Sequence, residues 1–460
     1  MADLSYGLNA WIFLNEDEPP GTNYNSADSC YQSLIQYRVY GAINLLGIAF
    51  FEVVSAAEGS TIQIGEHSHP GNPSDPSQPL TNQDYLSYVL RDARTVNPDI
   101  KFLATMVYSG SQTLAAVFSG GGDPQTEATT FANNLVAYLK ANGMNGLDVD
   151  WEGDVAQDMT QTQFQILFST IRQVFDAQEE KYYLTMAPAW SDSTYDFPTL
   201  ENAFDVVSPQ FYDGTALSQF LGAGMSPSNI GYGAQFEPGN AAPNASAQQV
   251  WSAVSPGFTY QGTSYAYQDI FVWRLNSGNF QFEQAQLMIL AQLANPSAGN
   301  SFDDTAIVAA AGNPGITQMI IRSGDVLDAI QAVNTGTGSF NYGTQPPGTT
   351  IGVFTLLQHG GAGGGSQTVN IAPGDPITSI SGYTGTWYGH PCVLQLTLIG
   401  QSGAKYGPFG SMAGATSQTP FTQTGQAGQQ VVAFSGSTVT VPLAGGGQTA
   451  IIASLNAVFA

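Results

Sequence analysis

Positive charge is scarce in this sequence, which has ten Lys and Arg against 35 Asp and Glu and a formal net charge of −25. Nucleic acids and anionic membrane surfaces are bound by clusters of basic side chains. No such cluster is visible, so the sequence disfavours both kinds of partner. A neutral polymer such as a polysaccharide would not be repelled.

Cysteines, histidines and long apolar runs are also few. The two cysteines, Cys30 and Cys392, lie far apart, and we predict two free thiols. No stretch approaches the length of a membrane span, and the N-terminal segment MADLSYGLNAWIFLNEDEPP lacks the basic and apolar parts of a secretory signal. The histidines are scattered and form no Cys/His cluster, so we predict no metal ion and no cofactor.

Short apolar runs alternate with helical patterns up to about residue 295. We predict strands near residues 7–14, 43–54, 101–110, 146–154, 182–190, 203–213, 229–236 and 269–278. Helical segments such as 127–143 and 161–178 lie between them. This alternation predicts an α/β fold, a (β/α)8 TIM barrel. A doubly wound open sheet is the alternative, although no GxGxxG motif follows the first strand.

The composition changes near residue 313, where the chain becomes rich in Gly, Thr, Ser and Val. Short alternating segments replace the long helical patterns, which predicts an all-β domain. Proline and glycine within residues 296–315 mark the boundary. We therefore predict a barrel domain at residues 1–300, a linker at 301–315 and an all-β domain at 316–460.

The segment GLDVDWEGD, residues 146–154, concentrates carboxylates in a chain of which only 10% is charged. Alternate side chains of a strand share a face, so Asp148, Asp150 and Glu152 point into the barrel while the apolar residues between them face the outer helices. Glu152 comes last and reaches the C-terminal mouth, where active sites of this fold lie. Repulsion and desolvation raise the pKa of at least one of these carboxyls, which suits an acid that must stay protonated near neutral pH.

Two other interpretations of this segment are weaker. The three acids and Gly153 loosely follow the start of an EF-hand calcium loop, but its twelfth position is Met159, where the loop needs a bidentate Glu. A solvated acidic turn is the second alternative. The apolar residues at strand spacing argue against it.

Four segments resemble motifs of glycoside hydrolase family 18, which includes chitinases and endo-β-N-acetylglucosaminidases. NGLDVDWE at 145–152 is similar to the DGxDxDxE signature, and LTMAPAW, SPQFYD and FVWRLNSG resemble the fifth-, sixth- and last-strand motifs. The resemblance covers roughly residues 5–295 and implies a (β/α)8 glycosidase. The sequence departs from the pattern at Asn145, which replaces the first Asp, and in ATMVYSGS, which lacks the third-strand Ser-x-Gly-Gly.

The resemblance also implies a role for each candidate residue. Glu152 would donate a proton to the glycosidic oxygen, Asp150 would orient and stabilise the N-acetyl group, and Asp148 would be the buried supporting acid. Tyr212 would bond to the acetamido carbonyl, and Trp273 would stack on the sugar at the −1 subsite. Packing in the core is the alternative for Tyr212 and Trp273. The other substrate-binding candidates are Asp213, Gln210 and Met186.

The acids on this strand lie on one side of the bond, whereas ordinary glycosidases place two carboxylates on opposite sides. A nucleophile must come from elsewhere, and the family uses the acetamido oxygen of the substrate, held in an attacking geometry. We predict substrate-assisted, retaining hydrolysis of β-1,4 bonds next to N-acetylglucosamine, in chitin or chitooligosaccharides. The alternatives are an endo-β-N-acetylglucosaminidase acting on N-glycans and a non-catalytic chitin- or glycan-binding protein. This function leads us to expect a secreted or extracellular protein, exported by an unknown route.

The C-terminal segments IRSGDVLDAIQA, HGGAGGGSQTVNIAPGDPITSISGYTG and LTLIGQSGAKYGPFG resemble a jacalin-related lectin, an all-β β-prism. The resemblance implies a GxxxD sugar-binding loop at residues 324–328, completed by a glycine-rich loop at 359–365. Ala453 stands where the last repeat would carry its Asp, so we expect no site there. Mannose- or glucose-type sugars are the expected ligands, and a plain β-turn at GDVLD is the alternative. The candidate sugar-binding residues are Gly324, Asp325, Val326, Asp328, Gly360 and Gly361.

Overall fold

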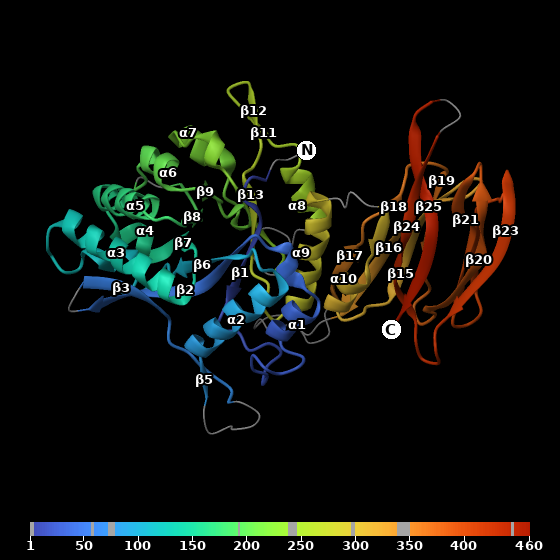
Figure 1. Ribbon diagram of the computed structural model, residues 1–460, viewed down its shortest axis with the longest axis horizontal. Helices are drawn as coiled ribbons and strands as arrows, with labels where there is room; N and C mark the ends of the chain where they lie inside the picture. Colours follow the sequence, from blue (N-terminus) through green and yellow to red (C-terminus); the bar gives the residue numbers. More distant parts are fainter. Residues whose placement is uncertain are drawn as a thin grey trace. The chain divides into compact units, whose positions relative to one another are not determined.

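The computed structural model describes residues 4–56, 59–71, 79–191, 194–237, 246–295, 300–337, 350–442 and 446–460. The chain forms two compact units, Met1–Glu283 and Gln284–Ala460, whose elements are labelled in Figure 1. Cys30 and Cys392 are both free and buried, as predicted. Among the described helices, none combines the length and the hydropathy that crossing a bilayer requires.

Within the described residues, unit 1 contains a ring of eight parallel strands. β1 pairs with β2 on one side and with β13 on the other, and the order continues through β6, β7, β8 and β9. A parallel bridge between Val207 and Ile230 joins β9 to the segment directly before β10 and closes the ring. The predicted (β/α)8 barrel is therefore confirmed. Its strands are β1 (Gly7–Phe13), β2 (Leu45–Ala56), β6 (Lys101–Met106), β7 (Gly146–Trp151), β8 (Tyr183–Pro188), β9 (Val206–Val207), β10 (Tyr232–Gln235) and β13 (Asp269–Trp273).

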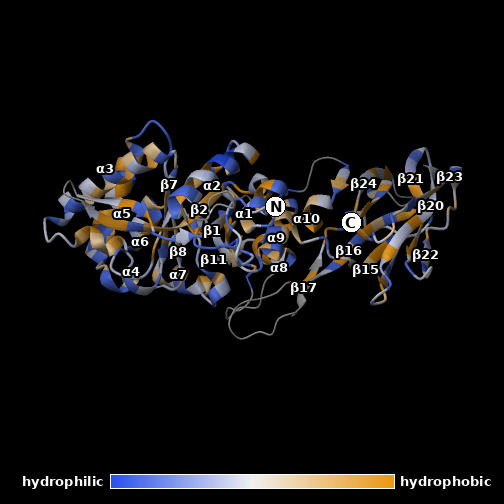
Figure 2. Cartoon of the chain, turned by 90° about the horizontal axis from the view of Figure 1, so that it is seen from below, coloured by the Kyte–Doolittle hydropathy of each residue, from blue (hydrophilic) through white to orange (hydrophobic). Residues whose placement is uncertain are grey.

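Helices follow the barrel strands. α5 illustrates why they form: Thr160 caps it by accepting a bond from the Gln163 N–H, while Gln163 bonds back to the Thr160 backbone. Its hydrophobic residues, coloured orange in Figure 2, include the buried Phe164 and Phe168. The helices are α1 (Cys30–Gln36), α2 (Asn82–Val96), α3 (Pro124–Asn142), α5 (Gln161–Asp176), α6 (Phe197–Ala203), α7 (Leu217–Ala223), α8 (Ala247–Val254) and α9 (Phe280–Ala294).

Two parts of unit 1 differ from the predicted strands. The segment 203–213 contributes the short strand β9, bonds to both neighbouring strands as far as Gln210, and then enters the 3₁₀ turn η3 (Phe211–Asp213). The strand predicted at 43–54 continues as β2 into an antiparallel hairpin with β3 (Gly59–Ile64). The short strands β4 (Ser68–His69) and β5 (Leu80–Thr81) follow it.

The described residues of unit 2 form three antiparallel sheets, which is the arrangement of a β-prism and confirms the predicted all-β fold. Residues 301–315, predicted as a linker, include β14 (Ser301–Asp303) and the short helix α10 (Thr305–Ala310), and β14 pairs with β24. The other strands are β15 (Ile316–Ser323), β16 (Leu327–Thr337), β17 (Thr350–Thr355), β18 (His359–Gly360), β19 (Gly365–Asn370), β20 (Ile377–Trp387), β21 (His390–Gly400), β22 (Lys405–Phe409), β23 (Ala415–Thr424), β24 (Val431–Pro442) and β25 (Gln448–Phe459).

Candidate active site

Strand β7 carries the acidic segment, and all of its residues are buried. Trp151 faces outward and packs edge-on against two rings of α5, Phe164 at 5.1 Å and Phe168 at 6.2 Å between centroids. Asp148 and Asp150 lie on the opposite face and bond to side chains from other barrel strands and loops. The predicted alternation of side chains along this strand is confirmed.

Asp148, Asp150 and Glu152 form what we call the acidic column. Asp148 lies at its bottom and is fully buried. Its carboxylate accepts hydrogen bonds from Trp11 Nε1 at 2.7 Å, Thr105 Oγ1 at 3.1 Å and Thr185 Oγ1 at 2.5 Å. Gly47 leaves space for the indole, because a Cβ there would collide with the ring of Trp11. Burial raises the pKa of Asp148, and the three bonds oppose this effect. Asp148 therefore joins its own strand, β7, to β1, β6 and β8.

Asp150 is the next acid in the column and is only 9% exposed. Gln210 Nε2 donates to its Oδ1 at 2.9 Å and to the backbone oxygen of Ala187 at 3.1 Å. Burial first, and then the charges of Glu152 and Asp148, raise the pKa of Asp150 well above its ordinary value. The structure thus brings the predicted residue Gln210 into direct contact with a predicted catalytic acid.

Glu152 follows the end of β7, directly before the short helix α4 (Gly153–Asp158), and is half-buried. Desolvation, followed by the charge of Asp213, raises its pKa. Tyr108 lies within electrostatic range of the same acids. Burial, and then the charges of Glu152 and Asp150, raise the pKa of its hydroxyl. A carboxyl group in these surroundings retains its proton to higher pH than an exposed glutamate.

Tyr212 and Asp213 lie in η3, in the segment that follows β9. Burial raises the pKa of Tyr212 well above its ordinary value, and the charges of Asp150 and Glu152 add to this effect. Asp213 is exposed and acts on the pKa of Glu152. The structure therefore brings both predicted residues within electrostatic range of the acidic column.

Trp273 ends β13 and packs against the aromatic residues inside the barrel. Its ring lies 5.9 Å from that of Trp11, the donor to Asp148, and 6.0 Å from that of Phe50. Met186 is placed differently. It follows Thr185, which faces Asp148, so the alternation along β8 directs buried Met186 away from the acids and toward the outer layer.

Sequence reasoning missed Arg274, the residue after Trp273. Arg274 is 4% exposed, and its guanidinium forms ion pairs with Glu16 and, at 3.1 Å, with Glu237. These pairs fasten the chain next to Trp273 to two other segments of the barrel. The sequence did contain a signal for this residue. Arg274 follows an apolar strand motif in a chain with few cations, and a buried basic residue requires acidic partners.

The predicted sugar-binding loop of unit 2 surrounds Asp328, which is 8% exposed. A Cβ at Gly363 or Gly364 would collide with its carboxylate, so only glycine allows the loop to approach this closely. Burial raises the pKa of Asp328, and a bond with the backbone of Gly324 opposes this. Arg322, which sequence reasoning missed, holds the glycine loop by donating to the backbone oxygen of Gly363 at 2.9 Å.

The other candidates in this loop are engaged in packing. Gly360 pairs with the strand β16, and the Gly361 N–H donates to the backbone oxygen of Asp328 at 3.2 Å. Asp325 accepts a bond from Ser411 Oγ at 3.2 Å. Val326 is buried in a hydrophobic cluster of this unit. Gly363 and Gly364 therefore lie closer to the carboxylate of Asp328 than Gly360 and Gly361 do.

The acids lie at the C-terminal end of a strand of a (β/α)8 barrel, which is where barrel enzymes have their active sites. The family model described as glycosyl hydrolases family 18 matches residues 24–254, half of the chain, and the model of the jacalin-like lectin domain matches residues 295–441. The chain belongs to glycosyl hydrolases family 18 and carries a jacalin-like lectin domain. It is a glycosidase with a carbohydrate-binding domain.

Three solved structures are similar to parts of the chain. A family 18 N-acetylglucosaminidase from Paenibacillus barengoltzii is 15% identical, with 63% of this chain and 99% of that one covered and a TM-score of 0.40. A family 18 chitinase from Pseudoalteromonas aurantia is 16% identical, with 62% and 99% covered and a TM-score of 0.40. A mannose-binding jacalin-related lectin from Ananas comosus is 28% identical, with 32% and 85% covered and a TM-score of 0.22. The comparison with curated proteins gave no match.

Proposed function

We propose that the barrel hydrolyses β-1,4 bonds next to N-acetylglucosamine, in chitin or chitooligosaccharides. One observation carries this proposal: Asp148 and Asp150 lie on one face of β7, Glu152 directly follows that strand, and burial raises the pKa of each. Such a column supplies a protonated acid on one side of the bond. It leaves the attack on the anomeric carbon to the acetamido group of the substrate.

The proposed reaction has two steps. Glu152 transfers its carboxyl proton to the glycosidic oxygen as the bond from that oxygen to C1 breaks, and the acetamido carbonyl oxygen forms a new bond to C1. Water then attacks C1 and gives a proton to Glu152, while the bond between C1 and the acetamido oxygen breaks. Two displacements at C1 retain its configuration.

Neighbouring groups would position the acetamido group during these steps. Asp150, held by Gln210, would accept the acetamido N–H and stabilise the positive charge that develops on the ring. Tyr212, whose hydroxyl stays protonated because its pKa is raised, would donate to the acetamido carbonyl. Trp273 would offer its ring face to the sugar. Asp148 would act indirectly, by fixing the strand below Asp150.

The lectin unit is proposed to bind mannose- or glucose-type sugars at Asp328, whose carboxylate would accept bonds from neighbouring sugar hydroxyls beside Gly363 and Gly364. A neutral glycan suits the strongly acidic chain, whose formal net charge is −25. Because polymers and glycans of this kind lie outside cells, we also propose that the protein acts there.

Replacement of the proton donor tests the enzymatic proposal. Glu152→Gln keeps the shape of the side chain but cannot transfer a proton, so release of products from chitooligosaccharides should fall by about 100-fold to 10,000-fold. Binding of the same oligosaccharides, measured by calorimetry, should persist. Glu201→Gln, on the exposed face of α6, is the matched control and should hydrolyse at the wild-type rate.

The choice of substrate separates the alternatives. Cleavage of chitooligosaccharides but not of glucose oligomers, which lack the acetamido group, supports the proposal. Cleavage confined to N-glycans would replace it with the endo-β-N-acetylglucosaminidase. Binding without product from the wild-type protein would leave a glycan-binding barrel and reject hydrolysis.

A further inference from the structure

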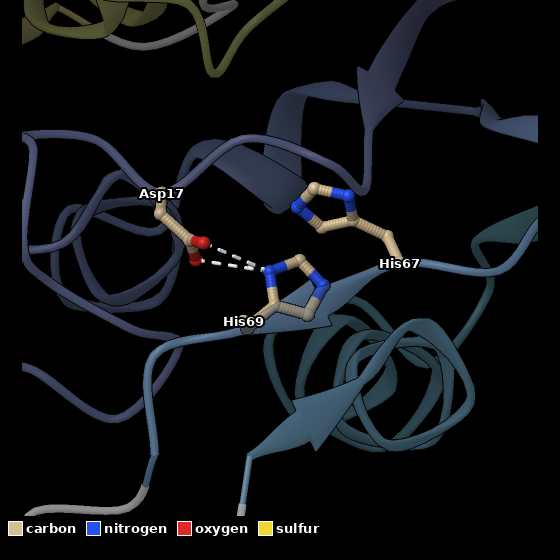
Figure 3. A group of neighbouring side chains, drawn as sticks. All are labelled: Asp17, His67 and His69. Carbon is tan, nitrogen blue, oxygen red and sulfur yellow. Dashed lines mark hydrogen bonds and ion pairs between the residues drawn. The ribbon is translucent and has the colours of Figure 1, made fainter.

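Asp17, His67 and His69 form a cluster outside the acidic column (Figure 3). One ligand atom from each residue lies within 4.8 Å of the others. Asp17 belongs to the segment between β1 and α1, whereas the histidines precede and form part of β4, after the β2–β3 hairpin. The pattern His-x-His in an extended segment places both rings on one side of the chain.

Hydrogen bonds fix which nitrogen of His69 faces Asp17. The Asn82 amide nitrogen donates to Oδ1 of Asn15 at 2.8 Å and to the backbone oxygen of Gly65 at 2.7 Å. Its carbonyl oxygen therefore faces His69 and accepts a bond from Nε2 at 2.8 Å. This leaves Nδ1 of His69 directed at Asp17. A ring whose second N–H donates to a fixed oxygen is the usual arrangement of a metal-binding histidine.

The first two candidate ligands are already held in place. Nδ1 of His69 lies 3.0 Å from Oδ2 of Asp17, and the two atoms need to separate only to about 3.4 Å for each to lie about 2.1 Å from a tetrahedral zinc ion. The Tyr85 hydroxyl donates to Oδ1 of Asp17 at 2.6 Å, and the Tyr85 ring stacks on that of His69 with 3.6 Å between centroids. Both side chains are therefore positioned before any ion binds.

His67 is the third candidate ligand and lies on the side of the cluster that faces solvent. It is exposed, and its ring lies 4.7 Å from that of His69 at 69°. In Figure 3 one of its ring nitrogens is turned toward Asp17.

We propose that Asp17, His67 and His69 bind a divalent transition-metal ion, with zinc as the probe. Two imidazoles and one carboxylate, with water in the remaining position, form a ligand set that zinc accepts. Calcium and magnesium require oxygen ligands and do not suit two imidazoles. The ion would lie between Nδ1 of His69 and Oδ2 of Asp17, which are 3.0 Å apart.

Such an ion would fasten the segment after β1 to the segment after β2, at the end of the barrel where the acids lie. The effect reaches Trp273 through the chain, because Glu16, next to Asp17, pairs with the adjacent Arg274. The ion would thus stabilise the segments that hold Trp273, the residue predicted to stack on the sugar. It takes no part in the proposed bond cleavage, so the two proposals are tested separately.

The test uses the full chain after removal of metals with a chelator. Calorimetric titration should give a single equivalent of bound zinc per chain, and zinc should raise the Tm. Cobalt in place of zinc should give the visible absorption of a low-coordinate Co²⁺ ion with nitrogen ligands. Removal of an exposed ligand by His67→Ala should weaken zinc binding by about 10-fold or more and leave the far-ultraviolet circular dichroism unchanged.

His390→Ala is the matched control, because His390 lies in β21 of the other unit. It should bind zinc as the wild-type protein does. Asp17→Asn is the second variant, near-isosteric with the native residue, and should also lose affinity. The proposal is overturned if the wild-type chain binds no zinc, or if both ligand variants bind it with wild-type affinity. Asp17 and His69 would then be an ion pair that only supports the loop.

Discussion

Two acids that lie two residues apart on the same strand face have different surroundings. Asp150 is almost fully buried, and its pKa is raised first by burial and then by the charges of Glu152 and Asp148. Glu152 is half-buried, and Asp213 is the charge that raises its pKa. These carboxyls repel one another when both are charged. At neutral pH the pair therefore holds more protons than two isolated acids would.

The charge of Asp213 adds to desolvation in raising the pKa of Glu152, so it should contribute to the alkaline limit of activity. Glu152 donates only while it is protonated, so the hydrolysis rate falls as pH rises through its raised pKa. Asp213→Asn removes the charge that raises this pKa, and the alkaline limb of the kcat profile should move to lower pH. Asp158→Asn, an exposed acid on α4, is the control and should leave the limb in place. An unmoved limb in the Asp213 variant would contradict the assignment of Glu152.

At this scale the sequence predicts acids better than it predicts their partners. Asp148, Asp150 and Glu152 were visible because a strand alternates its side chains. Trp11 and Thr185 were not, since they reach Asp148 only through the register of other strands. The same limit explains why a metal site was not predicted: the two histidines are neighbours, but their acidic partner lies about 50 residues earlier.

A second buried carboxyl group joins two strands of the barrel to the segment that follows a third. Asp269, the first residue of β13, accepts bonds from Asn9 Nδ2 of β1 and from Ser208 Oγ, next to β9, each at 2.8 Å. Burial raises its pKa to about 7, against an ordinary value of 3.8. The folded barrel therefore favours the protonated form of Asp269, whereas the unfolded chain loses this proton near pH 4.

The stability of the barrel should consequently fall as pH rises. The contribution of Asp269 is fully present below about pH 4 and is lost as pH rises through about 7, because the fold then holds a buried charge. Asp269→Asn keeps both bonds, since its amide oxygen can accept from Asn9 and its NH2 can donate to Ser208. The decrease in unfolding free energy between pH 5 and pH 8.5, measured in urea, should shrink by about 1–3 kcal/mol.

Glu283 adds a second contribution of the same sign to the decrease in stability with pH. Its pKa is raised to about 8 by burial, so part of the pH dependence will remain in the Asp269 variant. Asp99→Asn changes an exposed acid in the same unit and should keep the full wild-type decrease. Equal decreases in the wild-type protein and Asp269→Asn would mean that Asp269 does not carry a buried charge at high pH.

Elements were predicted where their signal is local. The helix at 161–178 is observed as α5 (Gln161–Asp176), because its caps and its apolar face lie within the segment itself. The strand at 203–213 shortened to β9, since its later part is shaped by Gln210 reaching Asp150 and Ala187. Periodicity cannot report such contacts, because they depend on where other elements lie.

The chain as a whole joins a glycosidase barrel to a jacalin-like lectin unit. The change in composition near residue 313 predicted that a second domain exists. It could not predict that β14, at 301–303, belongs to that domain, because its partner β24 lies more than 100 residues later. A binding unit on the same chain raises the effective concentration of the enzyme near a glycan that the unit binds.

The lectin unit should carry its own sugar site, centred on Asp328. Asp328→Asn preserves the size of the side chain but removes the charge that strengthens its bonds to sugar hydroxyls, so mannose binding by the full chain should weaken about 10-fold to 100-fold. Asp303→Asn is the control, because Asn bonds to the Thr305 N–H as well as Asp does. Calorimetry with mannose measures both. Wild-type affinity in Asp328→Asn would place the sugar elsewhere on the unit, and no heat from any of the proteins would exclude mannose as its ligand.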